Sequence, residues 1–495
     1  MKKGSDRKRV STGVPGLDKV LNGGLPEGRI YLVHGQAGTG KTTLGMQYLM
    51  AGAAAGRRCL GITLLQTLSE LEDIVASHGW DIDGIVLTEL PKEVRDSATL
   101  GQTVFEPADV ELPEVTDAIL AAIEEHQPDC LFIDSLSELS VLVDTGFQLR
   151  RELLRLKQHL DSIDCTTILS AGPSGDIEFG SLATLVHGVI GLEMQAPVFG
   201  RPRRRALVSK MRGMKFQAGY HDADLVTGGL VVYPQITANA TPSSPVEVIP
   251  SGNAGVDTLL GGGMEEGTTC VITGTSGAGK SSLVNLYAHT AAARGVSSSV
   301  YCFDERIHTL LRRAKGLGMP LDEMVDRGVI KLNQIDVGQI SPGALTAMIR
   351  RDVEENGVRI IVLDSLSGYL QSMPGERELI TQLHELLSYL SEAGVLSLMV
   401  VASHGVFGSS EAPIDVSYIA DTVILLRHFE FRGEVRRCMA VLKKRYGSHE
   451  RTIREVQLGA TGLEVGEPLS AFSGVLTGLP RFEGAAAELF DSAPE

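Results

Sequence analysis

The sequence contains one stretch twice, and this repeat constrains the fold more than any other feature. Residues 11–44 and 250–283 align without a gap, with shared glycines, a shared aspartate and a shared lysine. Each copy ends in the pattern GxxxxGK[ST], as GQAGTGKT at 35–42 and GTSGAGKS at 274–281. A doubled motif inside a shared stretch is hard to obtain by chance. The chain is therefore predicted to fold as two similar domains in tandem.

Each half continues as short apolar runs that alternate with helical segments. The runs lie at 29–35, 130–136 and 166–172 in the first half and at 269–274, 359–366 and 396–404 in the second. Continuous apolar runs bounded by glycine are typical of parallel strands that are buried on both faces. Alternation with helices, such as the segment 42–56, predicts an α/β class with right-handed crossovers.

The domain boundaries follow from composition. We expect a basic, disordered leader at 1–9, a first domain at 10–236, a second domain at 248–468 and a tail at 469–495. The small, polar and proline-containing stretch 237–247 is typical of a linker. The basic start has no apolar stretch behind it, so no secretory signal is expected.

Charge and composition exclude several classes of function. The formal net charge of −16 argues against a polyanion as a general partner, so we expect no nucleic acid. One basic cluster, RPRRR at 201–205, is expected in a loop, as a solvated hairpin tip. No run reaches the ~18–20 apolar residues that a membrane helix needs. The six cysteines include no CxxC pair, which favours buried, reduced thiols in a cytoplasmic protein and no structural metal.

The two glycine-rich loops predict phosphate binding, because their backbone N–H groups can converge on phosphate oxygens at a helix N-terminus. Lys41 and Lys280 are expected to neutralise the β- and γ-phosphates of ATP, and the hydroxyls of Thr42 and Ser281 to join the shell of Mg²⁺. The expected nucleotide-binding residues are Gly35, Gly38, Gly40, Lys41, Thr42 and Thr43 in the first loop, and Gly274, Ser276, Gly277, Gly279, Lys280, Ser281 and Ser282 in the second.

An aspartate ends one apolar strand in each half. Asp134 follows CLFI and Asp364 follows RIIVL, and Ser-Leu-Ser comes after both. A carboxylate at this place in such a site holds Mg²⁺, often through its water shell. An aspartate that merely caps a helix is the alternative, and the paired loops favour the metal role.

The two halves differ in their acids. Asp304 and Glu305 end a strand of the second half, where a carboxylate can take the proton of an attacking hydroxyl. Leu65 and Gln66 stand at the corresponding place in the first half, and an amide can orient a water but cannot take its proton. The first loop is therefore expected to bind ATP and to hydrolyse it slowly or not at all.

A Lys-x-Arg pair lies late in each half, as Lys210 with Arg212 and as Lys443 with Arg445. Residues i and i+2 of a strand face the same side, so each pair presents two cations together. One interpretation is two solvated charges on an edge strand. The other is that they reach the γ-phosphate held by a neighbouring subunit, as arginine fingers do.

These motifs, with SPGAL at 341–345 and GEVRRCMAVLKKRYGSHERTIRE at 433–455, resemble the KaiC family of clock-type ATPases and autokinases within the RecA-like superfamily. The resemblance covers about residues 10–480 and implies two tandem RecA-like P-loop NTPase domains. It also implies a homohexamer of two stacked rings, with ATP and Mg²⁺ between subunits, and a small regulatory or two-component signalling protein as partner. In that family the second ring phosphorylates its own serine and threonine, and the first ring is the steady ATPase.

The resemblance places the phosphoacceptor segment at 415–426. The adjacent Ser-Thr pair of the family becomes Ser417-Tyr418 here, so Ser417 is the candidate phosphoacceptor. A strand hydroxyl satisfied by a neighbour is the alternative. The leading hypothesis is a slow ATPase and serine/threonine autokinase, with Lys280, Asp304, Glu305, Lys443 and Arg445 as the catalytic residues of domain two. A RecA-like DNA-dependent ATPase and an ATP-binding scaffold without kinase activity are the alternatives.

Overall fold

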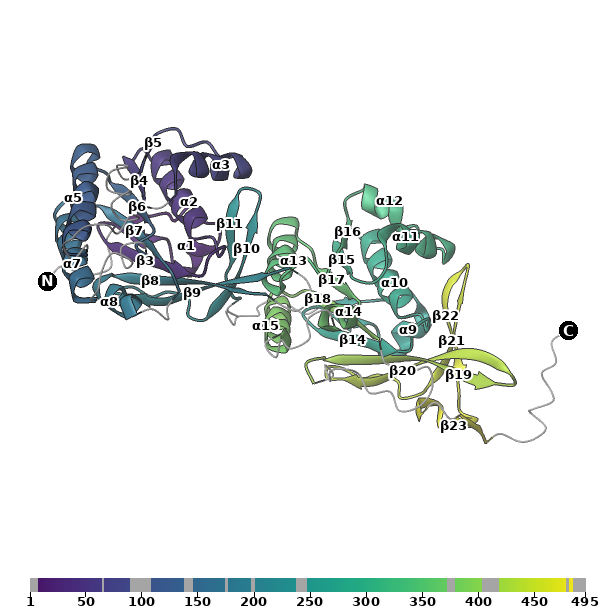
Figure 1. Cartoon of the computed structure of the whole chain (residues 1–495). Helices are drawn as coiled ribbons and strands as arrows, with labels where there is room; N and C mark the ends of the chain where they lie inside the picture. Colours follow the sequence, from purple (N-terminus) through teal and green to yellow (C-terminus); the bar gives the residue numbers. More distant parts are fainter. Residues whose placement is uncertain are drawn as a thin grey trace. The chain divides into compact units, whose positions relative to one another are not determined.

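The computed structural model describes residues 8–64, 66–89, 108–137, 146–173, 177–196, 201–236, 247–371, 379–402, 418–477 and 480–483. The chain divides into two compact units, Met1–Gln235 and Ile236–Glu495 (Figure 1). The linker that we propose at 237–247 lies, apart from Glu247, outside the described residues, as do most of the leader and the last part of the tail.

The first unit is built on a nine-stranded sheet in the order β11-β10-β9-β8-β3-β7-β6-β4-β5. The strands are β3 (Ile30–Gly35), β4 (Cys59–Thr63), β5 (Ile85–Glu89), β6 (Cys130–Asp134), β7 (Thr166–Ala171), β8 (Gly188–Gln195), β9 (Arg203–Met211), β10 (Tyr220–Val226) and β11 (Gly229–Tyr233). The strands from β8 to β5 run parallel, and β9, β10 and β11 add an antiparallel edge. A small antiparallel pair, β1 (Arg9–Val10) and β2 (Leu25–Pro26), precedes the sheet.

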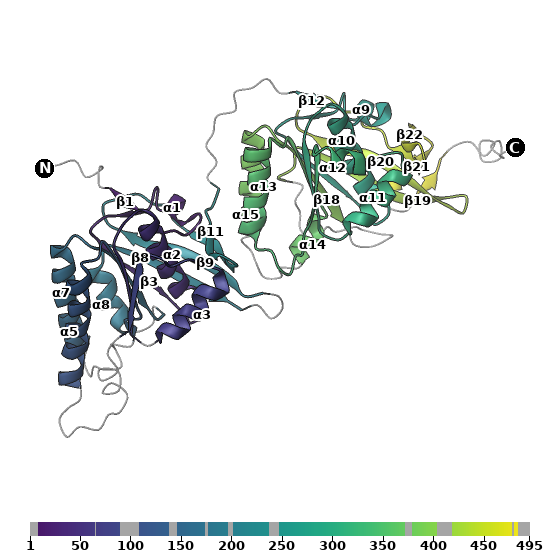
Figure 2. The same cartoon turned by 90° about the horizontal axis from the view of Figure 1, so that it is seen from above.

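Helices cover both faces of this sheet (Figure 2). The helices are α1 (Leu17–Val20), α2 (Lys41–Ala54), α3 (Leu68–His78), α5 (Ala108–His126), α7 (Gly146–Ser162) and α8 (Ile177–Leu185). Tyr31 and Val33 of β3 pack in the core under α2, while Ile30 and Leu32 pack in the core under α5, α7 and α8. This alternation explains why the whole run is apolar, since both sides of the strand are buried.

The second unit repeats the plan, with a nine-stranded sheet in the order β16-β15-β17-β18-β14-β19-β20-β21-β22. The strands are β14 (Thr269–Gly274), β15 (Ser298–Cys302), β16 (Ile330–Gln334), β17 (Ile360–Asp364), β18 (Leu396–Ala402), β19 (Thr422–Phe431), β20 (Glu434–Lys444), β21 (Arg454–Gly459) and β22 (Gly462–Pro468). Two short pairs complete it: β12 (Val248–Ile249) with β13 (Met264–Glu265), and β23 (Phe472–Ser473) with β24 (Arg481–Phe482).

Its helices form two layers. One core contains residues of α9 (Ala254–Leu259), α10 (Lys280–Ala293), α11 (Ile307–Gly316) and α12 (Leu321–Asp326). The other contains residues of α13 (Pro342–Asn356), α14 (Leu366–Gln371) and α15 (Leu379–Glu392). Local signals set some of the ends: Ser341 caps α13 by accepting from the N–H of Ala344 at 3.1 Å, and Gly357, at φ 63°, follows its last turn.

The predicted fold class is confirmed, because each half is a mainly parallel sheet flanked by helices. One local prediction is wrong. The basic cluster at 201–205 is not all loop, since β9 begins at Arg203 and pairs with both β8 and β10. Within the described part of the chain, no helix combines the length and apolarity that crossing a bilayer demands. All six cysteines are buried and unbridged.

Candidate nucleotide-binding sites

The second glycine-rich loop joins β14 to α10. A Cβ on Gly274 would lie 1.7 Å from the carbonyl oxygen of Leu426, so only glycine fits at this close approach of two strands. The Lys280 ammonium folds back over the loop and donates to the carbonyl oxygens of Gly274 at 2.8 Å and Thr275 at 2.7 Å. Burial lowers the pKa of Lys280 to about 8. An anion beside this ammonium would stabilise its protonated form, which suits phosphate binding.

The first loop has the same geometry. The Lys41 ammonium donates to the carbonyl oxygens of Gly35 at 2.8 Å and Gln36 at 3.0 Å. Burial also lowers the pKa of Lys41, against the opposing effect of Asp134. Gly40 ends this loop at φ 103°, and Gly279 ends the second at φ 106°, a left-handed conformation that places the following helix N-terminus at the loop.

Each loop hydroxyl meets the predicted carboxylate. Thr42 Oγ1 donates to Asp134 Oδ2 at 2.5 Å, and Ser281 forms a hydrogen bond with Asp364. Burial raises the pKa of Asp364, although the bond from Ser281 and the charge of Arg313 oppose this. A divalent cation would compensate the buried charge, and hard oxygen donors are what Mg²⁺ prefers. The residues present in both sites therefore fit Mg²⁺.

Most of the sequence-predicted residues of the second half line one cavity of about 600 Å³, a size typical of ligand pockets, whereas Gly274, Lys443 and Arg445 do not line it. Asp304 accepts from Ser365 Oγ at 2.5 Å, and Glu305 forms an ion pair with Arg313 at 2.7 Å. The predicted residues that line the cavity are Ser276, Gly277, Gly279, Lys280, Ser281, Ser282, Asp304, Glu305 and Asp364.

Strand register supports the asymmetry between the halves. Thr63 pairs with Asp134 as Cys302 pairs with Asp364, so Gln66 takes the place of Glu305. The Oε1 atom of Gln66 is buried and has no hydrogen-bond partner among the described residues. Leu65, at the place of Asp304, lies outside the described residues. The first site thus has the phosphate loop and Asp134, the predicted metal carboxylate, but an amide at the position of the acid.

The late cations lie away from the loops of their own domains. Lys443 Nζ donates to the carbonyl oxygen of Ala420 at 2.7 Å, and Lys210 Nζ donates to that of Val186 at 2.8 Å. Arg445 pairs with Asp421 at 3.2 Å, just before β19 begins, and Arg212 Nη2 donates to Thr184 O at 3.0 Å. These contacts are at the edge of each sheet where the parallel strands begin, whereas the phosphate loops follow the strands' carboxyl ends.

Two arginines that sequence reasoning missed touch the loops directly. Arg437 Nε donates to the carbonyl oxygen of Gly277 at 3.3 Å, and Arg204 donates to that of Gly38 at 3.1 Å from Nε and Nη2. Arg204 precedes Lys210 by the same interval as Arg437 precedes Lys443. This repeated spacing was the signal that could have found them.

The candidate phosphoacceptor is not tested by the structure, since Ser417 lies outside the described residues. Its neighbour Tyr418 is 54% exposed, and the carbonyl oxygen of Tyr418 accepts from Arg445 at 2.9 Å. Tyr418, the residue after the predicted acceptor, is therefore hydrogen-bonded to Arg445, one of the late cations.

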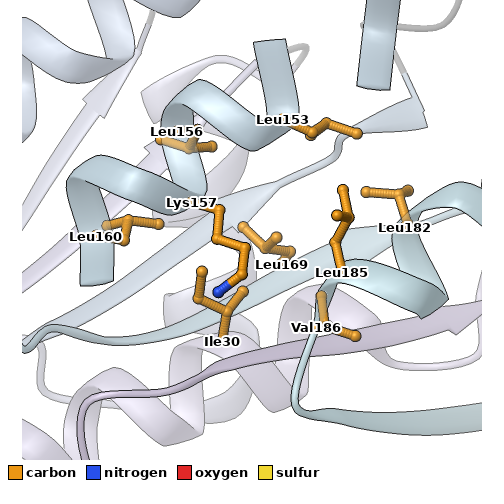
Figure 3. A pocket seen from close by; sticks show the side chains of 9 residues that line it. All are labelled: Ile30, Leu153, Leu156, Lys157, Leu160, Leu169, Leu182, Leu185 and Val186. Carbon is orange, nitrogen blue, oxygen red and sulfur yellow. The ribbon is translucent and has the colours of Figure 1, made fainter. Parts of the chain in front are cut away.

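The first domain also contains a mostly apolar hollow between α7, α8 and the sheet, which is lined by leucine side chains together with Ile30 and Val186 (Figure 3). Its free volume is about 10 Å³, which is at most the space of one water and too small for a nucleotide. Lys157 also lines this hollow, and its ammonium pairs with Asp161 at 2.6 Å. This hollow is a packing gap and not a ligand site.

Comparison with known proteins identifies the family. The family model described as "ATPase: KaiC" matches residues 10–237 and again residues 249–470. The chain belongs to the KaiC family. It is 26% identical over 481 residues to "Circadian clock protein KaiC3" of Synechocystis sp., which covers 96% of this chain and 95% of the relative. It is 27% identical over 485 residues to "Circadian clock oscillator protein KaiC" of Synechococcus elongatus, covering 95% and 92%.

The predicted family is thereby confirmed, and each half is a KaiC-type ATPase domain. The two halves differ in the acid pair, which only the second half has.

Proposed function

We propose that this KaiC-family protein is a slow ATPase and a serine/threonine autokinase that acts through its second domain as a signalling or clock-type regulator. One observation carries the proposal: Lys280, Asp364 and Glu305 line a single cavity, whereas Gln66 takes the place of the acid in the first domain. The first domain then binds ATP and hydrolyses it weakly.

The chemistry follows from the positions of these groups. An attacking oxygen, from water or from a serine hydroxyl, forms a bond to the γ-phosphorus as the bond to the β–γ bridging oxygen breaks and ADP leaves. Glu305 takes the proton of the attacking oxygen, with Asp304 beside it. Lys280 lies where it would balance charge on the phosphates. Mg²⁺, held by Ser281 and Asp364, would supply further charge neutralisation.

We propose a homo-oligomer, a hexamer by analogy with the family, in which ATP lies between neighbouring copies. Support comes from Lys443 and Arg445, which lie at the opposite edge of the sheet from their own phosphate loop. They suit the phosphates of an adjacent copy better than those of their own. A small regulatory or two-component signalling partner and a cytoplasmic location stay predictions.

The kinase part is tested by incubating the full chain with ATP and Mg²⁺ and mapping phosphorylated residues by mass spectrometry. Wild type is expected to carry phosphate on Ser417, while Glu305→Gln and Ser417→Ala do not. If Ser417 is unmodified in protein that turns over ATP, the proposed kinase activity is contradicted and the proposed ATPase activity still stands. Sizing the same samples with and without ATP tests the oligomer.

A second candidate applies to the first domain alone. Gln66 in place of an acid favours a site that holds ATP as a structural ligand. The first loop would then retain ATP, and not ADP, through a long incubation of Glu305→Gln protein. Mostly ADP in that sample would show that the first domain is a working ATPase. DNA-stimulated hydrolysis that falls steeply with salt would instead favour the DNA-dependent alternative.

A further inference from the structure

One arginine in the second domain connects the proposed base to the phosphate-loop helix. Arg313 lies on α11 and forms a two-pronged contact with Glu305, from Nη2 to Oε2 at 2.7 Å and from Nε to Oε1 at 3.3 Å. Its remaining terminal nitrogen, Nη1, donates to Ser282 Oγ on α10 at 3.1 Å. A planar guanidinium thus bridges the carboxylate and the helix that begins with Lys280.

The first domain provides an internal control for this arrangement. Helices α3 and α11 begin at Leu68 and Ile307, which follow the acid position at the same interval in the two copies. Counting from these starts, the place of Arg313 is taken by Ile74. The arginine is therefore present in the domain that has the acid, and isoleucine takes its place in the domain that has Gln66. This pattern links the arginine to the acid and not to nucleotide binding in general.

Stability alone does not explain the contact. The side chains of Arg313 and Glu305 are 29% and 28% exposed, and ion pairs with such access to water contribute little to folding. A two-pronged contact does fix the orientation of a carboxylate, which a lysine or a single hydrogen bond does not. Because a proton acceptor works only within a narrow range of geometry, orientation is the property that matters in this cavity.

We propose that Arg313 is a positioning residue that fixes the carboxylate of Glu305 relative to the phosphate site of the second domain. This inference rests on the proposed function, in which Glu305 takes the proton of the attacking oxygen. Arg313 ties the base to Ser282, on the same first helical turn as Lys280 and Ser281. The base and the phosphate-binding groups are then held as one unit.

The test measures ATP turnover and the affinity for a fluorescent ATP analogue in the full chain. The turnover that depends on Glu305 is the wild-type kcat minus the kcat of Glu305→Gln. Arg313→Gln is expected to lower this Glu305-dependent turnover by about 10-fold, while the affinity for the analogue stays within about twofold of wild type. Arg313→Lys is expected to fall between wild type and Arg313→Gln, because an ammonium cannot make the fork. Arg312→Gln, an exposed neighbour on the same helix, is the matched control and is expected to leave both values unchanged.

A double variant separates positioning from a general structural role. In protein that already carries Glu305→Gln, adding Arg313→Gln is expected to cause no further loss of turnover. Millimolar guanidinium ion is expected to restore part of the turnover of Arg313→Ala and none of that of Glu305→Gln. A residue that only stabilises α11 would instead give an additive loss in the double variant and no recovery of turnover with guanidinium ion.

Several outcomes would overturn the inference. These are unchanged or increased turnover in Arg313→Gln, a loss that appears in the affinity and not in kcat, or an additive loss in the double variant. A different result would overturn the proposed function instead: if Glu305→Gln itself leaves turnover and Ser417 phosphorylation unchanged, Glu305 is not the base. The two failures are therefore distinguishable in one set of proteins.

Discussion

The late cations allow a quantitative prediction about neighbouring copies. The backbone N–H of Arg445 donates to Asp421 O at 2.9 Å, whereas Gly274, where the phosphate loop begins, pairs with Leu426. Asp421, just before β19, and Leu426 within it are five residues apart, which corresponds to about 16 Å between the backbone of Arg445 and the start of the phosphate loop. Arg445 is therefore too far from the phosphate loop of its own domain to reach it, which agrees with our proposal that it acts on the nucleotide of another copy.

The perturbation is a mixture of two inactive variants. Lys280→Ala removes the phosphate lysine and keeps Arg445, while Arg445→Ala does the reverse. Each alone is expected to lose the turnover of the second domain. In an assembly formed at random from equal amounts, about one neighbour pair in four combines an intact Lys280 with an intact Arg445, so about a quarter of that turnover is expected to return.

The assay exchanges subunits before ATP is added and then measures phosphate release, with the rate of Glu305→Gln protein subtracted as background. Mixing each variant with itself is the control, and sizing confirms that mixed assemblies form. A mixed assembly whose rate stays at the mean of the two parents would refute the reasoning. It would show that the cations act within their own chain or have no part in turnover.

Three further predictions concern the two domains separately. Asp352 is almost fully buried and accepts hydrogen bonds from Ser299 and Tyr301 at 2.7 Å and from Lys331 at 2.6 Å. Asp352→Ala is therefore expected to reduce the free energy of unfolding by about 3 kcal/mol in urea titrations. A loss below about 0.5 kcal/mol would contradict this prediction, because that is the range of surface substitutions. Burial opposes ionisation of Asp352, but these hydrogen bonds outweigh it and hold its pKa below the usual value, so its contribution is present above the pKa of an unfolded aspartate, about 3.9, and is lost as the pH falls through the lower native value. Because the pKa of Lys280 is about 8, the affinity of the second site for ATP is expected to weaken as the pH rises from 7 to 9 in titrations with a fluorescent analogue, and a flat profile would argue against a buried ammonium there. In Glu305→Gln protein, Gln66→Glu is expected to raise phosphate release by the first domain, and Gln66→Glu with Ile74→Arg to raise it further; no gain in either variant would show that the missing acid is not what limits that site.

Local patterns explain why much of the architecture was predictable. Residues such as Gly274 and Gly40 are required by the backbone itself, and a run such as that of Cys130–Asp134 is apolar because both faces of its strand are buried. Both kinds of signal are visible in a short window of sequence. The phosphate loops and the strands that end in Asp134 and Asp364 could therefore be placed before the structure was known.

Contacts between distant segments could not be predicted in the same way. Arg313 meets Ser282, which lies 31 positions earlier in the chain, and Arg204 meets Gly38 because β8 and β9 pair as a hairpin next to β3, which leads into the loop. The cluster at 201–205 was misread because charges in a row are typical of loops. In β9 these arginines instead alternate between the two sides of a strand, and one of them reaches the phosphate loop.

One strand in each domain, β9 or β20, carries both an arginine that contacts the phosphate loop and one of the late lysines. Strand β20 places Arg437 on the phosphate loop of its own copy and, six residues later, carries Lys443, which we propose serves the next copy. In a closed ring, every catalytic centre would then be linked to the following one by a rigid rod about 20 Å long. ATP turnover at one site would then affect the next site around the ring, always in the same direction. The ring would therefore respond to ATP cooperatively, and the coupling between its sites would be directional.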